Sequence, residues 1–144
     1  MTRSKRLERI VALAELKRRQ ASQQLAESRR AHDADVAKLD QFRDYHAEYV
    51  SQLGSVGAVA SAARLVEQRR FIEQIERTIE VLDRQTQKSA ARCREDIRQW
   101  QRESHRRDAL GGILDDARSD AARGDEQRQQ REIDDRGRRG DDEA

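Results

Sequence analysis

Two stretches of apolar residues at helical spacing flank a short, weakly charged segment in the middle of the chain. On the first side, steps of three, four or seven join Leu39, Phe42, Tyr49 and Leu53, with Tyr45 beside them. On the second side, the same spacing joins Phe71, Ile72, Ile75, Ile79 and Leu82. The segment Gly54-Ser55-Val56-Gly57 between them has the small side chains and backbone freedom of a chain reversal. The pattern therefore predicts two helices that fold back antiparallel as a helical hairpin.

The predicted hairpin covers residues 1–112, with one helix at about 4–53, a turn at 54–61 and a second helix at about 62–110. Thr2 or Ser4 is expected to cap the first helix, and Ser61 the second. Heptad counting on the first helix gives two rows of inward positions: Val11, Arg18, Leu25, His32, Leu39, His46, Leu53 and Leu7, Ala14, Ala21, Ser28, Asp35, Phe42, Tyr49. The row on the second helix is Ile72, Ile75, Ile79, Leu82, Thr86, Ala90, Cys93, Ile97 and Trp100. A turn centred near Gly57 would place Ala14 opposite Trp100.

Composition supports an all-α coiled coil rather than a layered globular core. Charged residues make up 40 % of the 144 residues and aromatic residues 3 %, and proline is absent. The mean hydropathy of -1.12 would also suit a disordered chain. The sustained helical spacing favours helix over disorder up to about residue 110.

Charge is unevenly divided between a basic body and an acidic tail. From position 113 to the end there are 7 Arg and 11 Asp or Glu, which gives this segment a net charge of −4. Because the whole chain has a net charge of +2, residues 1–112 carry +6. Gly111-Gly112 predicts the end of the second helix, and residues 113–144 are expected to form a short helix that frays into a disordered charged tail.

No residue pattern indicates catalysis, a metal site or a bound cofactor. His32, His46 and His105 are far apart in the sequence, and none has metal-ligand spacing with the single Cys93. A lone cysteine forms no internal disulfide, which suits a reducing cytoplasm. No apolar run approaches the ~20 residues that span a bilayer. Glu8 and Glu15 interrupt the first apolar stretch, so we expect no signal peptide.

Aromatic residues near the predicted turn exceed what a two-helix interface can bury. Phe42 and Tyr49 can fill that interface, whereas Tyr45 lies at its edge or outside it, and Phe71 is displaced from Ile72. Exposed aromatic patches mark partner sites. We therefore predict a partner contact at Phe42, Tyr45, Tyr49, Phe71, Ile75 and Leu82. An asymmetric interface broadened by bulky residues is the alternative interpretation.

These residues resemble the flagellar export protein FliJ, a component of the bacterial flagellar type III export apparatus. The resemblance lies in Leu39-x2-Phe42-x2-Tyr45-x2-Glu48-Tyr49-x3-Leu53, followed after the turn by Phe71-Ile72-x2-Ile75-Glu76-x2-Ile79. It extends in layout over residues 5–110 and departs from the family at Leu65, Gln68 and Thr78. The injectisome stalk proteins of the same superfamily are similar in shape and role, and an injectisome stalk protein is therefore the alternative interpretation of this resemblance.

The resemblance implies a cytoplasmic, non-catalytic coiled coil similar to the two-helix part of the rotary ATPase gamma subunit. Its expected partners are a hexameric export ATPase, an export gate membrane protein and substrate-specific export chaperones, with contact to the inner membrane through these partners only. The predicted partner contact would then face the gate. Basic side chains at the open end of the hairpin would meet the ATPase ring: Arg3, Lys5, Arg6, Arg9, Arg102, Arg106 and Arg107.

Two other functions stay open on sequence alone. Paired arginines such as Arg29-Arg30 could neutralise nucleic-acid phosphates, although acidic residues are interleaved with them and no basic region leads into a zipper. A coiled-coil scaffold that forms homodimers would show the same heptads. No nucleic-acid partner is expected.

Overall fold

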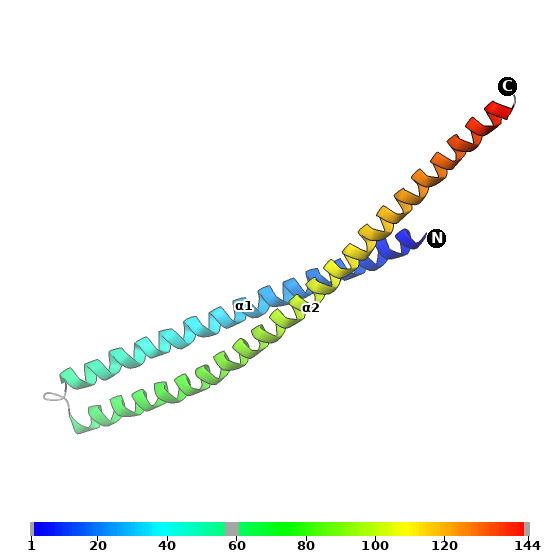
Figure 1. Ribbon diagram of the computed structural model, residues 1–144. Helices are drawn as coiled ribbons and strands as arrows, with labels where there is room; N and C mark the ends of the chain where they lie inside the picture. Colours follow the sequence, from blue (N-terminus) through cyan, green and yellow to red (C-terminus); the bar gives the residue numbers. More distant parts are fainter. Residues whose placement is uncertain (1, 57–60, 143–144) are drawn as a thin grey trace. The chain divides into compact units, whose positions relative to one another are not determined.

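The computed structural model describes residues 2–56 and 61–142, and these residues form two long helices packed together. Helix α1 spans Arg3–Val56 and α2 spans Ala62–Asp142. Within the described residues there is no strand. The predicted all-α antiparallel hairpin is confirmed (Figure 1).

Both helix starts carry the predicted caps. Thr2 Oγ1 accepts a hydrogen bond from the backbone N–H of Lys5 at 3.4 Å. Ser61 Oγ accepts one from the N–H of Arg64 at 3.3 Å. Each hydroxyl thus satisfies one of the backbone donors that a helix leaves unpaired in its first turn.

The chain divides into two units, each built from both helices. We call Ala21–Trp100 the hairpin unit, and Met1–Gln20 together with Gln101–Ala144 the terminal unit. The core of the hairpin unit consists of Ala21, Leu25, Leu39, Ile72, Ile75 and Leu82, joined by the buried Ser28. The core of the terminal unit is smaller and contains Ala14 and Leu114.

The heptad rows predicted for α1 describe its packed face. Buried or half-buried residues recur along α1 at alternating steps of three and four, from Leu7 to Leu53, and only Tyr49 among the predicted inward positions is exposed. Small and polar residues occupy the middle of this face. Ser28 is 1 % exposed and donates a hydrogen bond from Oγ to the Leu25 carbonyl at 3.1 Å. The regularity of the rows explains why sequence located this face correctly.

The predicted pairing between the helices is wrong by several residues. A centre at Gly57 would place Tyr49 opposite residue 66, but its ring contacts Phe71. Likewise Ala14 lies near Arg106 and Leu110 rather than Trp100. Gly54 to Val56, which were predicted to begin the turn, belong to α1. The rest of the predicted turn, residues 57–60, lies outside the described residues.

The predicted helix end at Gly111-Gly112 and the disordered tail after it are also corrected. Helix α2 continues through both glycines to Asp142. A glycine inside a helix costs about 1 kcal/mol relative to alanine, which lowers stability without ending the helix. After Gly112 the chain contains no proline. Asp–Arg pairs three residues apart support the helix there, at Asp120–Arg123 and Asp125–Arg128. Every described residue from 125 to 142 is nevertheless exposed.

Candidate functional site

The hairpin unit carries a cluster of four rings contributed by both helices, which we call the aromatic patch: Phe42, Tyr45, Tyr49 and Phe71. Phe42 and Tyr45 meet edge to face with ring centroids 5.9 Å apart. Tyr49 of α1 meets Phe71 of α2 in the same way at 4.8 Å. Two edge-to-face pairs of this kind hold the rings in fixed orientations on the surface.

Three of these rings remain accessible. Tyr45 is 41 % exposed, Tyr49 37 % and Phe71 45 %, whereas Phe42 is half-buried. The exposure predicted for Tyr45 and Phe71 is therefore present. Tyr49 was expected between the helices, but its ring lies against Phe71 and stays exposed. The Tyr45 hydroxyl accepts a hydrogen bond from Gln41 Nε2 at 2.9 Å, which orients this side chain further.

Two residues assigned to the partner contact from sequence belong to the core instead. Ile75 and Leu82 are each 6 % exposed and are packed between the helices. Their spacing fits the inward row of α2, but it also fits an exposed row that begins at Phe71. Helical periodicity alone did not distinguish these two positions. Neither side chain offers surface to a partner in this conformation.

A hollow of about 380 Å³ opens beside the aromatic patch. Its lining residues are Tyr49, Gln52, Glu67, Gln68, Phe71 and Ile72. Gln68 Oε1 is buried and has no hydrogen-bond partner among the described residues. Sequence reasoning missed Gln52, Glu67 and Gln68 as site residues. The available signal was the position of Gln68, four residues before Ile72 on the inward row of α2.

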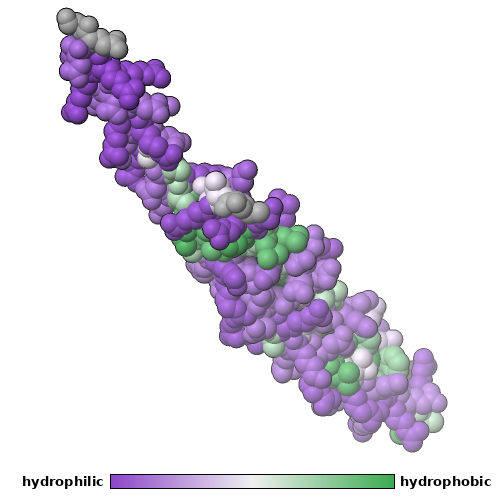
Figure 2. Space-filling model, turned by 90° about the vertical axis from the view of Figure 1, so that its right-hand side faces the viewer, coloured by the Kyte–Doolittle hydropathy of each residue, from purple (hydrophilic) through white to green (hydrophobic). Residues whose placement is uncertain are grey.

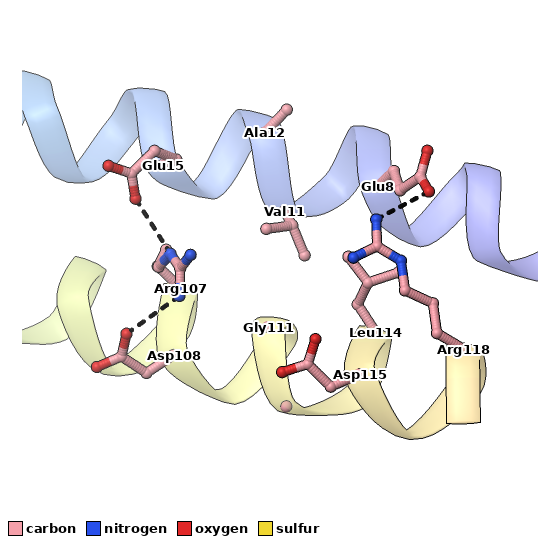
Figure 3. A pocket seen from close by; sticks show the side chains of 11 residues that line it. Glu8, Val11, Ala12, Glu15, Arg107, Asp108, Gly111, Leu114, Asp115 and Arg118 are labelled. Atoms are coloured by element: carbon pink, nitrogen blue, oxygen red, sulfur yellow. Dashed lines mark hydrogen bonds and ion pairs between the residues drawn. The ribbon is translucent and has the colours of Figure 1, made fainter. Parts of the chain in front are cut away.

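The terminal unit holds its two helices together by ion pairs that involve one of the predicted ring contacts. Arg107 Nε donates to Glu15 Oε2 at 3.1 Å, and its Nη1 lies 3.5 Å from Asp108 Oδ1. Arg118 Nη2 donates to Glu8 Oε1 at 2.9 Å. Figure 3 shows both arginines reaching from α2 toward α1. Arg107 therefore serves the packing of the unit rather than an open basic surface.

Glu15 is the centre of this charge network. Arg18 Nη2 donates to Glu15 Oε1 at 2.6 Å, and Arg19 Nε lies 3.4 Å from the same oxygen. The hydrogen bond from Arg18, with the charges of Arg18 and Arg107, lowers the pKa of the Glu15 carboxyl below its ordinary value of 4.5, against a smaller effect of desolvation. The same hydrogen bond raises the pKa of Arg18.

A groove of about 680 Å³ runs between these ion pairs. Its lining combines acidic and basic residues with Val11, Ala12 and Leu114. Figure 3 shows Val11 between the two helices, flanked by the Glu15–Arg107 and Glu8–Arg118 ion pairs. Gly111 and Gly112 lie in the same lining, and a methyl group added at Gly112 would meet nothing within 4 Å. The two glycines thus widen the space between the helices.

The other predicted basic contacts are exposed: Arg3, Lys5, Arg6, Arg9, Arg102 and Arg106. Exposed aliphatic residues accompany them on α1, namely Ile10, Leu13 and Leu16. Figure 2 shows hydrophobic surface beside strongly hydrophilic surface on the unit that contains the N-terminal part of α1. The basic residues and the aromatic patch belong to different units.

The described residues contain no group of three or more His, Cys, Asp or Glu side chains that could hold a metal ion. Cys93 is a free, half-buried thiol. Neither α1 nor α2, over the positions described, has a stretch long and apolar enough to cross a membrane.

Fold and surface together define a two-helix hairpin protein with a fixed, exposed aromatic patch. The family described as flagellar FliJ protein matches residues 3–140, nearly the whole chain. The chain belongs to the FliJ family, and its role is related to flagellar protein export. No curated protein and no solved structure matches it.

Proposed function

We propose that this protein is a non-catalytic stalk of the flagellar type III export apparatus, coupling the hexameric export ATPase to the membrane export gate. The observation that carries the proposal is the aromatic patch, whose Tyr45, Tyr49 and Phe71 rings are ordered yet exposed on a member of the FliJ family. Ordered aromatic side chains lose little conformational entropy on binding and supply much contact area. In this proposal the patch contacts the gate.

The ATPase ring would contact the terminal unit through its exposed basic side chains: Arg3, Lys5, Arg6, Arg9, Arg102 and Arg106. Arg107 is left out because Glu15 already binds it. Cationic side chains favour encounter with acidic surfaces and mainly affect the association rate. The protein would also handle emptied export chaperones, and would lie in the cytoplasm beside the inner membrane through its partners.

The gate contact is tested by titrating the purified chain against the cytoplasmic domain of the export gate protein by calorimetry. Tyr45→Ala and Phe71→Ala should each weaken binding about tenfold or more, as for aromatic interface residues, and should leave the helical circular dichroism unchanged. Val81→Ala is the matched control for Phe71→Ala, because Val81 is 55 % exposed, lies on the same helix as Phe71 and is outside the patch. If Tyr45→Ala and Phe71→Ala bind the gate domain as tightly as Val81→Ala and the unaltered chain do, the gate contact is refuted.

The ring contact is tested separately with the export ATPase. Replacing Arg6 and Arg9 with Glu should slow association, and the difference from the unaltered chain should shrink in high salt. Arg29→Glu is the control, since Arg29 is an exposed arginine of the hairpin unit. Identical association rates for all chains would contradict the proposed contact between the terminal unit and the ATPase ring.

A further inference from the structure

The N-terminal part of α1 carries an exposed face that combines cations with aliphatic side chains and contains no acidic residue. Three aliphatic side chains on it are widely accessible: Ile10 is 45 % exposed, Leu13 53 % and Leu16 52 %. Residues three or four positions apart are neighbours on a helix surface, and such steps join these side chains to three exposed cations. We call this set the basic-aliphatic face: Arg6, Arg9, Ile10, Leu13, Leu16 and Lys17.

The ion pairs of the terminal unit leave the positive charge of this face unbalanced. Glu8 and Glu15 are the only acidic residues among positions 1–20, and both bind arginines of α2. Within the described residues, the side chains of Arg6, Arg9 and Lys17 form no ion pair. The basic-aliphatic face therefore favours a partner that is negatively charged and can also accept aliphatic side chains.

Helix α2 borders this face without forming a deep pocket beside it. Arg106 and Leu110 of α2 line a hollow of about 30 Å³ together with Ile10, Leu13 and Lys17. A hollow of this size holds little more than one water molecule. The face is thus a filled surface, suited to a broad partner rather than to an inserted side chain.

We propose that the basic-aliphatic face binds the surface of a membrane that contains anionic lipids. In this arrangement α1 lies in the plane of the interface, and its aliphatic side chains enter the boundary between head groups and acyl chains. The cations contact lipid phosphates, since long basic side chains can pass along apolar surface while their charged ends stay in water. The inference goes beyond the proposed function, in which the membrane is reached only through partners.

Two other kinds of partner fit this face less well. A partner helix needs an apolar row that repeats every seven residues, but the position seven after Ile10 is Lys17 and the position seven before Leu13 is Arg6. A helix interface there would bury both charges, which is unfavourable. Nucleic acid would bind the cations but leave the aliphatic side chains in water, and the face has no ring on which a base could stack.

The test is flotation of the full chain with vesicles made of equal parts of phosphatidylglycerol and phosphatidylcholine. Binding is expected to these vesicles and not to vesicles of phosphatidylcholine alone. Added salt should weaken this binding without abolishing it, because salt screens the charges but not the insertion of aliphatic side chains. Absence of binding to the anionic vesicles, or equal binding to both kinds, would overturn the proposal.

Two double variants test the two components of the face. Arg9→Gln combined with Lys17→Gln should weaken vesicle binding about thirtyfold, at about 1 kcal/mol for each cation near the surface. Ile10→Ser combined with Leu13→Ser should weaken it about tenfold or more, because the exposed aliphatic area no longer enters the lipid. Unchanged binding by either double variant would contradict the proposal, provided circular dichroism shows the variant folded.

The hairpin unit supplies matched controls for both variants. Arg29→Gln combined with Arg30→Gln removes two exposed cations, and Val50→Ser combined with Val66→Ser removes two exposed aliphatic side chains. Both control variants should bind the anionic vesicles as the unaltered chain does. Equal losses in the controls and in the variants of the basic-aliphatic face would refute the assignment to this face.

Association with the export ATPase distinguishes this inference from the proposed function. If the Arg6 and Arg9 replacements slow association with the ATPase while vesicle binding of both double variants is unchanged, the ring contact stands and the lipid contact is refuted. If vesicle binding changes as expected while all chains associate with the ATPase at the same rate, the lipid contact stands and the ring contact fails.

Discussion

Arg107 of α2 and Glu15 of α1 are joined by a hydrogen bond of 3.1 Å between Nε and Oε2. They are 92 positions apart in the sequence, and the bond ties the N-terminal part of α1 to α2 inside the terminal unit. Glu15 also binds Arg18 and Arg19, so a single carboxylate organises three arginines. Removing it leaves those cations close together, with Asp108 beside Arg107 as partial compensation.

The first prediction concerns pH. A carboxyl whose pKa is lowered by folding stabilises the folded state above the unfolded-state value, here 4.5, and loses that contribution as pH falls through the folded-state pKa. Glu15→Gln should therefore lower the thermal unfolding midpoint at neutral pH, and the difference from the unaltered chain should disappear as the pH falls below 4.5 and through the lowered folded-state pKa of Glu15. Circular dichroism melts at several pH values measure this.

The control for this pH series is Glu48→Gln, which removes an exposed carboxylate from the hairpin unit. Its unfolding midpoint should follow that of the unaltered chain at every pH. A Glu15→Gln difference that is independent of pH would contradict the role assigned to the carboxylate charge.

The second prediction separates two neighbouring glycines. A methyl group at Gly112 meets open space, so Gly112→Ala should raise the free energy of unfolding by about 1 kcal/mol. A methyl group at Gly111 would lie 3.1 Å from Arg107 Nη1, so Gly111→Ala should stabilise less, because it displaces the guanidinium that binds Glu15. Urea unfolding of both variants makes the comparison. Equal stabilisation would mean that Arg107 adapts without loss.

The third prediction uses adjacent residues of α2 that differ in burial. Leu82 is 6 % exposed and Val81 is 55 % exposed. Leu82→Ala should lower the free energy of unfolding by about 2–5 kcal/mol, whereas Val81→Ala should change it by less than about 0.5 kcal/mol. Denaturant titration is the measurement. If Leu82→Ala were neutral for folding and weakened gate binding alone, the sequence-based assignment of Leu82 to the partner contact would be restored.

The fourth prediction tests whether the helices pair within one chain. His32 Nδ1 lies 3.1 Å from Ser89 Oγ across the helix interface. With Cys93 replaced by serine, His32→Cys combined with Ser89→Cys should be crosslinked by a short bismaleimide into a monomeric product. Light scattering of the unaltered chain should likewise give the mass of a monomer. Crosslinked dimers would favour the scaffold alternative.

Sequence predicted the fold class and the packed face of α1 because apolar residues at both ends of the seven-residue rows define the face, and burial continues along these rows through the polar Ser28 and His32. It did not predict the pairing of the helices, since glycine is compatible with both helix and turn, and Gly54 proved helical. For the same reason, Gly111 and Gly112 were wrongly predicted to end α2. Packing across the interface, which single-chain periodicity does not encode, decided these positions.

The candidate site was predictable only in part. Tyr45 and Phe71 lie off the inward rows, and so their exposure followed from helix geometry. Ile75 and Leu82 were predicted both on the inward row and in the partner contact, because helical spacing alone is compatible with either position. The packing of α1 against α2 buries both side chains. The hollow at Gln68 needed coordinates, since it depends on which residues of α1 lie opposite.

The exposed C-terminal part of α2, residues 125–142, has no buried side chain to share with the rest of the molecule. Its backbone hydrogen bonds are therefore maintained by local energetics alone, which for a short single helix in water are marginal. Its amide hydrogens should exchange with solvent through local opening, long before those of the hairpin unit. The chain thus ends in a segment whose order a bound partner could regulate at little energetic cost.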